Sequence, residues 1–114
     1  WSSDVCSSDL SSDDKLKTNR EKLNNALSKV LLLNGFTFNW NEKAISLGFD
    51  KDQSCVGVSA QEVQKVLPEA VVERNYNGED ILLVKYEKLV PLLIEAIKEL
   101  NEKVESLERK LSNK

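Results

Sequence analysis

The spacing of apolar residues between positions 90 and 111 constrains this chain most. These residues recur at intervals of three and four, so each falls on position a or d of a heptad. Position a holds Val90, Ile97, Val104 and Leu111, and position d holds Leu93, Leu100 and Leu107. One helix cannot bury such a seam by itself, so the sequence predicts a coiled coil between copies of the chain over residues 90–114.

The heptads also indicate how the helices pair. Lys103 at position g and Glu108 at the next position e can form an ion pair between parallel helices. Branched residues at a with leucine at d favour a dimer on the general rule for coiled coils. Pro91 fits this helix only if it lies in the first turn.

Three shorter segments upstream are typical of strands. Residues 36–40 alternate apolar and polar side chains, which predicts a half-buried strand. Residues 55–58 predict a buried strand, and residues 81–84 predict another after Asn77-Gly78, a pair suited to a type I′ hairpin. The expected fold class is therefore α+β, with a small strand-and-helix domain at residues 11–89 before the coiled-coil helix.

Two capping-box patterns mark expected helix starts. Thr18-Asn19-Arg20-Glu21 precedes apolar residues at helical spacing, and Gly35 supplies a stop. Ser59-Ala60-Gln61-Glu62 opens a short helix that Pro68 ends. Between these helices, residues 44–49 predict a short strand or loop.

A serine and a lysine stand five residues apart at Ser12 and Lys17, in a chain without histidine. Lysine can be the base for a serine nucleophile if burial lowers its pKa from about 10.4. Five residues along a helix set side chains about 140° apart, and on a strand they lie on opposite faces. The segment must therefore turn, or Lys17 must come from a neighbouring chain. The alternative is a solvated polar segment without chemistry.

Residues 12–17, Ser-Asp-Asp-Lys-Leu-Lys, resemble the opening motif of the self-cleaving C-terminal chaperone domains of phage tailspikes, tail fibres and endosialidases. The resemblance continues in the family's order through residues 27–30, 36–40, 56–63, 66–69, 84–91 and 94–100. The blocks Ala-Gln-Glu-Val and Glu-Ala-Ile-Lys-Glu-Leu within these ranges are its most specific parts.

The resemblance implies roles for individual residues. Ser12 is the expected nucleophile and Lys17 the expected general base, with cleavage between residues 11 and 12. Asp13 is a possible supporting residue. Gln61 and Glu62 either cap a helix and lie at the surface, or place polar groups beside the scissile bond. Lys15 stands where the family more usually has arginine, which keeps the charge but loses the planar fork.

The resemblance also implies an assembly. Such domains align three chains, assist folding of an upstream fibre domain of the same polypeptide, and then release themselves. We therefore expect a homotrimer, although the heptads point to a dimer. The expected location is a phage virion tail made in the bacterial cytoplasm.

Residues 1–10 differ in character from the rest. Reverse-translated, they match one frame of a common high-throughput sequencing adapter, so we interpret them as a translation artefact rather than native sequence. A Ser/Asp-rich linker is the alternative. On the first interpretation we expect the native chain to be longer at its N-terminus.

Composition excludes several classes of function. With 16 basic and 19 acidic residues, charge gives no case for nucleic acid or an anionic membrane. No apolar run reaches the roughly 18 residues that a membrane span needs. Cys55 is the only cysteine outside residues 1–10, so no disulfide is expected within the native chain. Asp50–Ser54 lacks the following glycine and glutamate of an EF-hand. The sequence also has no Gly-rich phosphate loop and no metal-ligand cluster, so neither metal nor cofactor is predicted.

These observations leave three hypotheses. The first is a self-cleaving trimerisation chaperone, a serine autopeptidase acting once through Ser12 and Lys17. The second is an assembly module with the same fold that does not cleave. The third is an unrelated coiled-coil adaptor that binds another protein.

Overall fold

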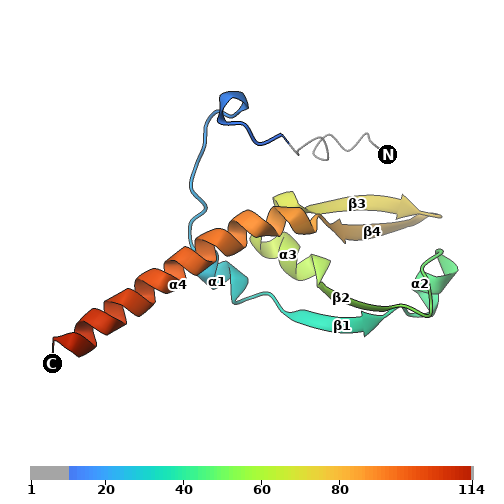
Figure 1. Ribbon diagram of the computed structural model, residues 1–114. Coiled ribbons are helices and arrows are strands. Elements are labelled where there is room, and N and C mark those ends of the chain that lie inside the picture. The colour runs from blue at the N-terminus through green and yellow to red at the C-terminus, as the bar shows by residue number, and fades with distance from the viewer. Residues whose placement is uncertain (1–10, 114) are drawn as a thin grey trace.

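A long C-terminal helix and two antiparallel hairpins define the architecture (Figure 1). The computed structural model describes residues 11–113, so the interpretation of residues 1–10 lies outside the described range. The helix is α4 (Leu89–Ser112). The hairpins pair β1 (Gly35–Asn39) with β2 (Ser54–Val58), and β3 (Val71–Tyr76) with β4 (Glu79–Val84). The α+β prediction with a long C-terminal helix is confirmed, and the trimer remains a prediction.

The hydrophobic core lies where the shorter helices meet the first half of α4. Helix α1 (Ala26–Val30) packs on α4 (Figure 1), and α3 (Ala60–Val66) packs against β3 and β4. A 3₁₀ turn at Pro68–Ala70 joins α3 to β3. The buried residues are Ala26, Val63, Val66, Leu67, Ala70, Leu89, Leu92 and Ala96. Since this core includes residues of α4, the domain boundary expected at residue 89 falls inside one packed unit and stays a prediction.

Helix α1 begins later than the sequence predicts. The capping box at Thr18–Glu21 is not used, because residues 17–25 have no helical structure and the helix starts at Ala26. Asn25 precedes it in the left-handed conformation, with φ of 56°, and its side chain makes no capping bond. The cap comes instead from Glu99 of α4, whose Oε2 and Oε1 accept the Ala26 and Leu27 backbone N–H groups at 2.9 Å each.

The segment between β1 and β2 also differs from expectation. Residues 44–49 were predicted as a strand or loop, but helix α2 spans Glu42–Ser46. Asn41 begins it, because its side chain accepts the Ala44 N–H at 2.9 Å and satisfies a free donor of the first turn. Strand β2 forms as predicted but is only partly buried: Gly57 is buried and Val58 half-buried, whereas Val56 is 78% exposed. A two-stranded sheet leaves one face uncovered unless another layer packs on it.

Three local predictions are confirmed. Asn77 and Gly78 have φ of 51° and 88°, as a type I′ turn between β3 and β4 requires. The Ser59 hydroxyl accepts the Glu62 N–H at 3.3 Å and begins α3, although the Glu62 side chain turns to Asn34 instead of completing the box. Pro91 lies in the first turn of α4.

Helix α4 carries two apolar stripes, of which the sequence revealed only one. Leu89, Leu92 and Ala96 face α1 and α3 and are buried. The heptad seam lies on an adjacent face, and its seven residues from Val90 to Leu111 are 44% to 68% exposed. The second stripe was missed because it spans only about two turns at the start of the helix.

Candidate functional site

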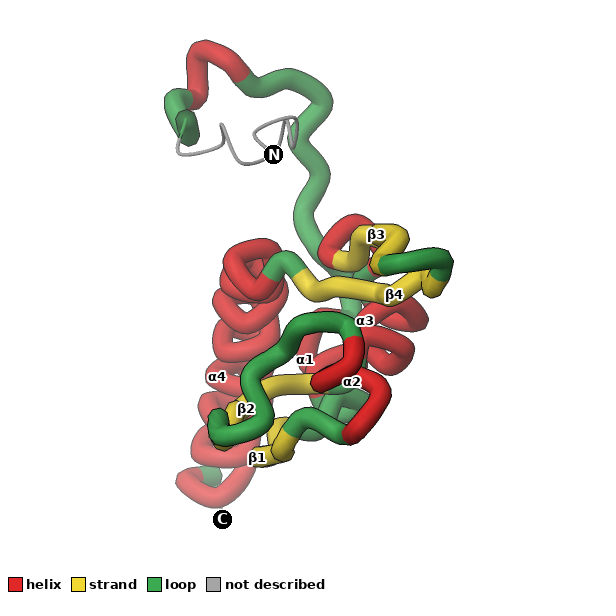
Figure 2. Tube along the Cα trace, turned by 90° about the vertical axis from the view of Figure 1, so that its right-hand side faces the viewer, coloured by secondary structure: helices red, strands yellow, loops and turns green. Residues whose placement is uncertain are grey.

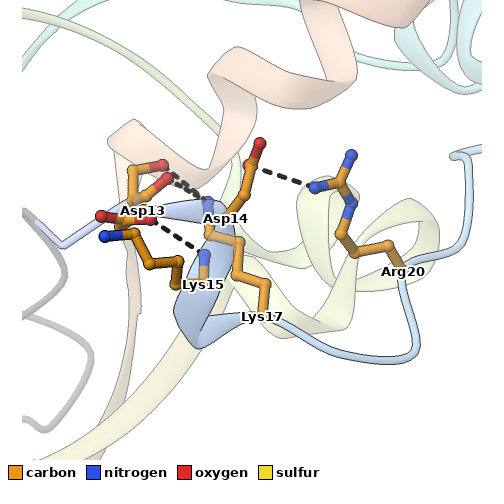
Figure 3. A network of polar contacts seen from close by, with 6 residues as sticks. Asp13, Asp14, Lys15, Lys17 and Arg20 are labelled. Carbon is orange, nitrogen blue, oxygen red and sulfur yellow. Dashed lines mark hydrogen bonds and ion pairs between the residues drawn. The ribbon is translucent and has the colours of Figure 1, made fainter.

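A tight turn at residues 12–17, called here the N-terminal turn, forms the candidate site. Its centre is one turn of 3₁₀ helix at Asp14–Leu16. The Asp13 carboxylate caps it by accepting the Lys15 N–H at 2.9 Å, and the Lys17 N–H closes it on the Asp14 carbonyl at 3.1 Å (Figure 3). This is the turn that the spacing of Ser12 and Lys17 requires, so one chain brings them together.

The two candidate catalytic side chains are in direct contact. Lys17 Nζ donates to Ser12 Oγ at 2.6 Å and to the Ser12 carbonyl oxygen at 3.1 Å. A base must lie within about 2.6–3.2 Å of the oxygen whose proton it takes, and this pair does. Both residues are exposed in the single chain. The geometry thus suits a serine–lysine pair, while its surroundings are open to water.

An ion pair on the other side of the turn was not anticipated. Arg20 Nη1 lies 3.1 Å from Asp14 Oδ1, linking the turn to the segment that follows it (Figure 3). Both groups are exposed, so the pair contributes little to stability, on the order of 0–1 kcal/mol. The six-residue separation matches no helical or strand pairing rule, so no sequence pattern predicted this ion pair.

Gln61 and Glu62 lie on α3, and the N-terminal turn stands away from that helix in both views (Figures 1 and 2). Glu62 Oε2 accepts from the Asn34 amide at 3.3 Å, while its Oε1 is buried with no hydrogen-bond partner among the described residues. Gln61 lines a groove between the hairpins together with Phe38 and Tyr86. That Gln61 and Glu62 lie beside the scissile bond therefore stays a prediction. It would require contact between two chains.

Within residues 11–113, no cluster of three or more acidic or cysteine side chains could hold a metal ion. Over the same range, no helix combines the length and apolarity of a membrane span.

Comparison with known proteins shows the family of this chain. Residues 12–72 match the family model described as chaperone of endosialidase, peptidase S74. The chain therefore belongs to the chaperone of endosialidase family, which is a family of serine autopeptidases. The match begins at Ser12, the first residue of the candidate pair.

Phage fibre proteins are the relatives found. The chain is 41% identical over 103 residues to the long tail fiber protein Gp37 of Enterobacteria phage K3, covering 90% of this chain and 8% of that protein. The protein of the same name from Enterobacteria phage T2 matches with the same figures. That of Enterobacteria phage M1 is 37% identical over 110 residues, or 92% of this chain and 41% of that protein. The chain thus spans less than half of each of these relatives.

Proposed function

We propose that this chain is a C-terminal intramolecular chaperone that assembles three copies of a phage fibre protein and then cleaves itself off before Ser12. The 2.6 Å contact between Lys17 Nζ and Ser12 Oγ carries the proposal, because it supplies a nucleophile and a base in one turn. Membership in a family of serine autopeptidases supports it. The Gp37 relatives suggest that the upstream partner is a tail fibre domain and that the product belongs to the virion.

The proposed reaction begins when a neutral Lys17 amine takes the Ser12 hydroxyl proton. Oγ attacks the carbonyl carbon of Ser11, and the bond from that carbon to the Ser12 nitrogen breaks as the nitrogen gains a proton. An ester now joins the Ser11 acyl group to Ser12 Oγ. Water hydrolyses the ester, releasing a carboxylate at Ser11 and restoring the hydroxyl on the new N-terminal residue, Ser12.

The proposed reaction also requires that Ser12 and Lys17 be buried, which they are not in a single chain. A lysine acts as a base near neutral pH only when desolvation disfavours its charged form. Because Ser12 and Lys17 are exposed in one chain, we propose that a neighbouring copy or the upstream fibre covers them. Cleavage would then follow assembly.

The proposed assembly forms along the seam of α4. Beyond residue 100 the seam residues of α4 face solvent in the single chain, with Val104, Leu107 and Leu111 44%, 58% and 68% exposed. A helix of about 12 residues is marginal alone in water, so another copy is the expected source of stability. We propose a parallel homotrimer, following the family resemblance rather than the heptad rule for dimers.

The test expresses the chain behind a fibre domain and follows the cut by mass spectrometry. We expect cleavage between Ser11 and Ser12 without added protease. Ser12→Ala should abolish cleavage while the assembly keeps its mass, since only the nucleophile is lost. Lys17→Arg should abolish it too, because arginine keeps the charge but does not give up its proton in a protein.

Two outcomes would contradict the proposed chemistry. Full cleavage in Ser12→Ala would assign the cut to a contaminating protease. Cleavage in Lys17→Arg alone would require another base for Ser12.

A non-cleaving assembly module is the second candidate. The exposure of Ser12 and Lys17 favours it, since nothing in the single chain shields the pair from water. An intact wild-type protein in a stable trimer would select this function over the first.

A further inference from the structure

The root of the N-terminal turn, residues 21–27, is held against α4. The Glu99 carboxylate accepts the Ala26 and Leu27 N–H groups. One turn earlier, Glu95 Oε1 lies 3.9 Å from Lys22 Nζ. Glu21, Lys22 and Leu23 share a shallow depression with Pro91, Ile94 and Glu95. The root therefore follows α4 from Pro91 to Glu99 and sets where the N-terminal turn leaves the body.

The Glu99 carboxylate supplies the N-terminal cap that no local side chain of α1 provides. Asn25 occupies the N-cap position but makes no capping bond with its side chain. A helix of five residues is too short to persist without tertiary support. The first turn of α1 thus depends on a carboxylate 72 and 73 residues away in sequence.

Hydrogen bonds and nearby positive charges favour the ionised form of the Glu99 carboxylate. The hydrogen bonds from Leu27 and Ala26 lower its pKa below the usual 4.5, and the positive charges of Lys22 and Lys103 act in the same direction. Glu95, one turn earlier, is held by Lys22 and by Lys98, whose Nζ lies 3.4 Å from Glu95 Oε2. The cap is therefore present at neutral pH.

Glu99 also lies where the two halves of α4 meet. It precedes Leu100 of the seam, and the seam residues from Leu100 to Leu111 are exposed in the single chain. Covering the seam with another copy stabilises α4 through this point, because a helix that gains packing over its second half frays less at its middle. Assembly would thereby hold Glu99 in place for capping.

We propose that Glu99 is a positioning residue that couples assembly along α4 to self-cleavage at Ser12. Its carboxylate caps α1, and α1 fixes the direction in which residues 12–25 leave the body. This inference rests on the proposed function. It accounts for how a pair formed within a single chain becomes dependent on other copies.

The first experiment measures the self-cleavage rate of the chain behind its fibre domain in three variants. Glu99→Gln keeps the shape but leaves one oxygen for two N–H groups, so the rate should fall about tenfold while the assembly keeps its mass. Glu99→Asp retains both oxygens and the charge and should restore part of the rate. Glu102→Gln, an exposed residue on the same helix, removes the same charge as a matched control and should cleave like the wild type.

The second experiment uses amide hydrogen exchange at Ala26 and Leu27. Leu107→Asp disrupts the seam two turns beyond Glu99 without touching the cap. At a concentration where sedimentation shows this variant to be monomeric, protection at both amides should fall about tenfold or more. Glu99→Gln should lower the same protection in the assembled protein.

The outcomes separate this inference from the proposed function. A wild type that does not cleave overturns the proposed function, and the exchange data then decide whether assembly controls the cap. A wild type that cleaves, with Glu99→Gln equally fast, overturns the role of Glu99. Unchanged protection in monomeric Leu107→Asp overturns the coupling in either case.

Discussion

The two halves of α4 follow one heptad pattern but have different surroundings. The first half buries Leu92 and Ala96 against α1 and α3 of the same chain. The second half, from residue 101 onward, runs away from the hairpins to the C-terminus (Figure 1), and its seam residues are 44% to 68% exposed. The seam is exposed along both halves.

This difference separates two kinds of stability. The first half is stabilised within the chain, through an apolar stripe lying beside the seam. The second half has no such stripe, so its order depends on whatever covers the seam. A change in the buried stripe should therefore alter folding of the chain at every protein concentration, and a change in the seam should act through association.

The largest effect is expected from Leu100→Asp at the seam. A charge in each copy would have to be buried without a partner, which costs several kcal/mol, so the proposed assembly should dissociate. Sedimentation equilibrium at tens of micromolar should give the monomer mass for the variant and a trimer for the wild type. A monomeric wild type would remove the basis for the proposed assembly.

Leu92→Ala should have the next largest effect, and on folding rather than association. Leu92 is fully buried between α4 and its neighbours, so truncation should lower the free energy of unfolding by about 2–5 kcal/mol. Leu107→Ala is the matched control at the seam. Urea denaturation should show a lower free energy of unfolding for Leu92→Ala at every protein concentration. For Leu107→Ala the decrease should appear only at concentrations where the wild type is assembled.

A smaller effect is expected from Gly57→Ala, where β2 meets the chain leading into α4. An added Cβ would lie 2.6 Å from Tyr86 Oη, the atom that accepts the Val58 N–H at 3.2 Å. Overpacking of this kind costs about 1–3 kcal/mol. Gly35→Ala, next to open space, is the control. Equal melting temperatures for the two variants would contradict the close approach.

The smallest effect concerns acid. Because its hydrogen bonds lower the pKa of Glu99 in the folded chain, its contribution is present above about pH 4.5 and is lost as the pH falls through the folded pKa. Wild type and Glu99→Gln should therefore differ in melting temperature at pH 7 and converge as the pH falls through the lowered pKa of Glu99. A difference that persists once the carboxylate is protonated would mean that Glu99 stabilises the chain other than as a carboxylate.

Sequence alone determined the features that a few neighbouring residues encode. The heptads gave the long helix, Asn77-Gly78 gave the hairpin turn, and Ser59 gave the start of α3. In each case the signal is a backbone preference or a side-chain period, which acts over one or two turns. The pairing of Ser12 with Lys17 was also a local question, although the spacing left a choice between a turn and a second chain.

The start of α1 and the burial of Leu92 depend on residues that lie far away in the sequence, so tertiary packing sets both. Helix α1 begins at Ala26 and not after Thr18, because Glu99 supplies hydrogen-bond acceptors there and no local side chain does. The burial of Leu92 beside an exposed seam likewise depends on where α1 and α3 pack. Free backbone N–H groups and apolar surface take whichever partner the fold brings near, and local sequence does not specify a partner some 70 residues away.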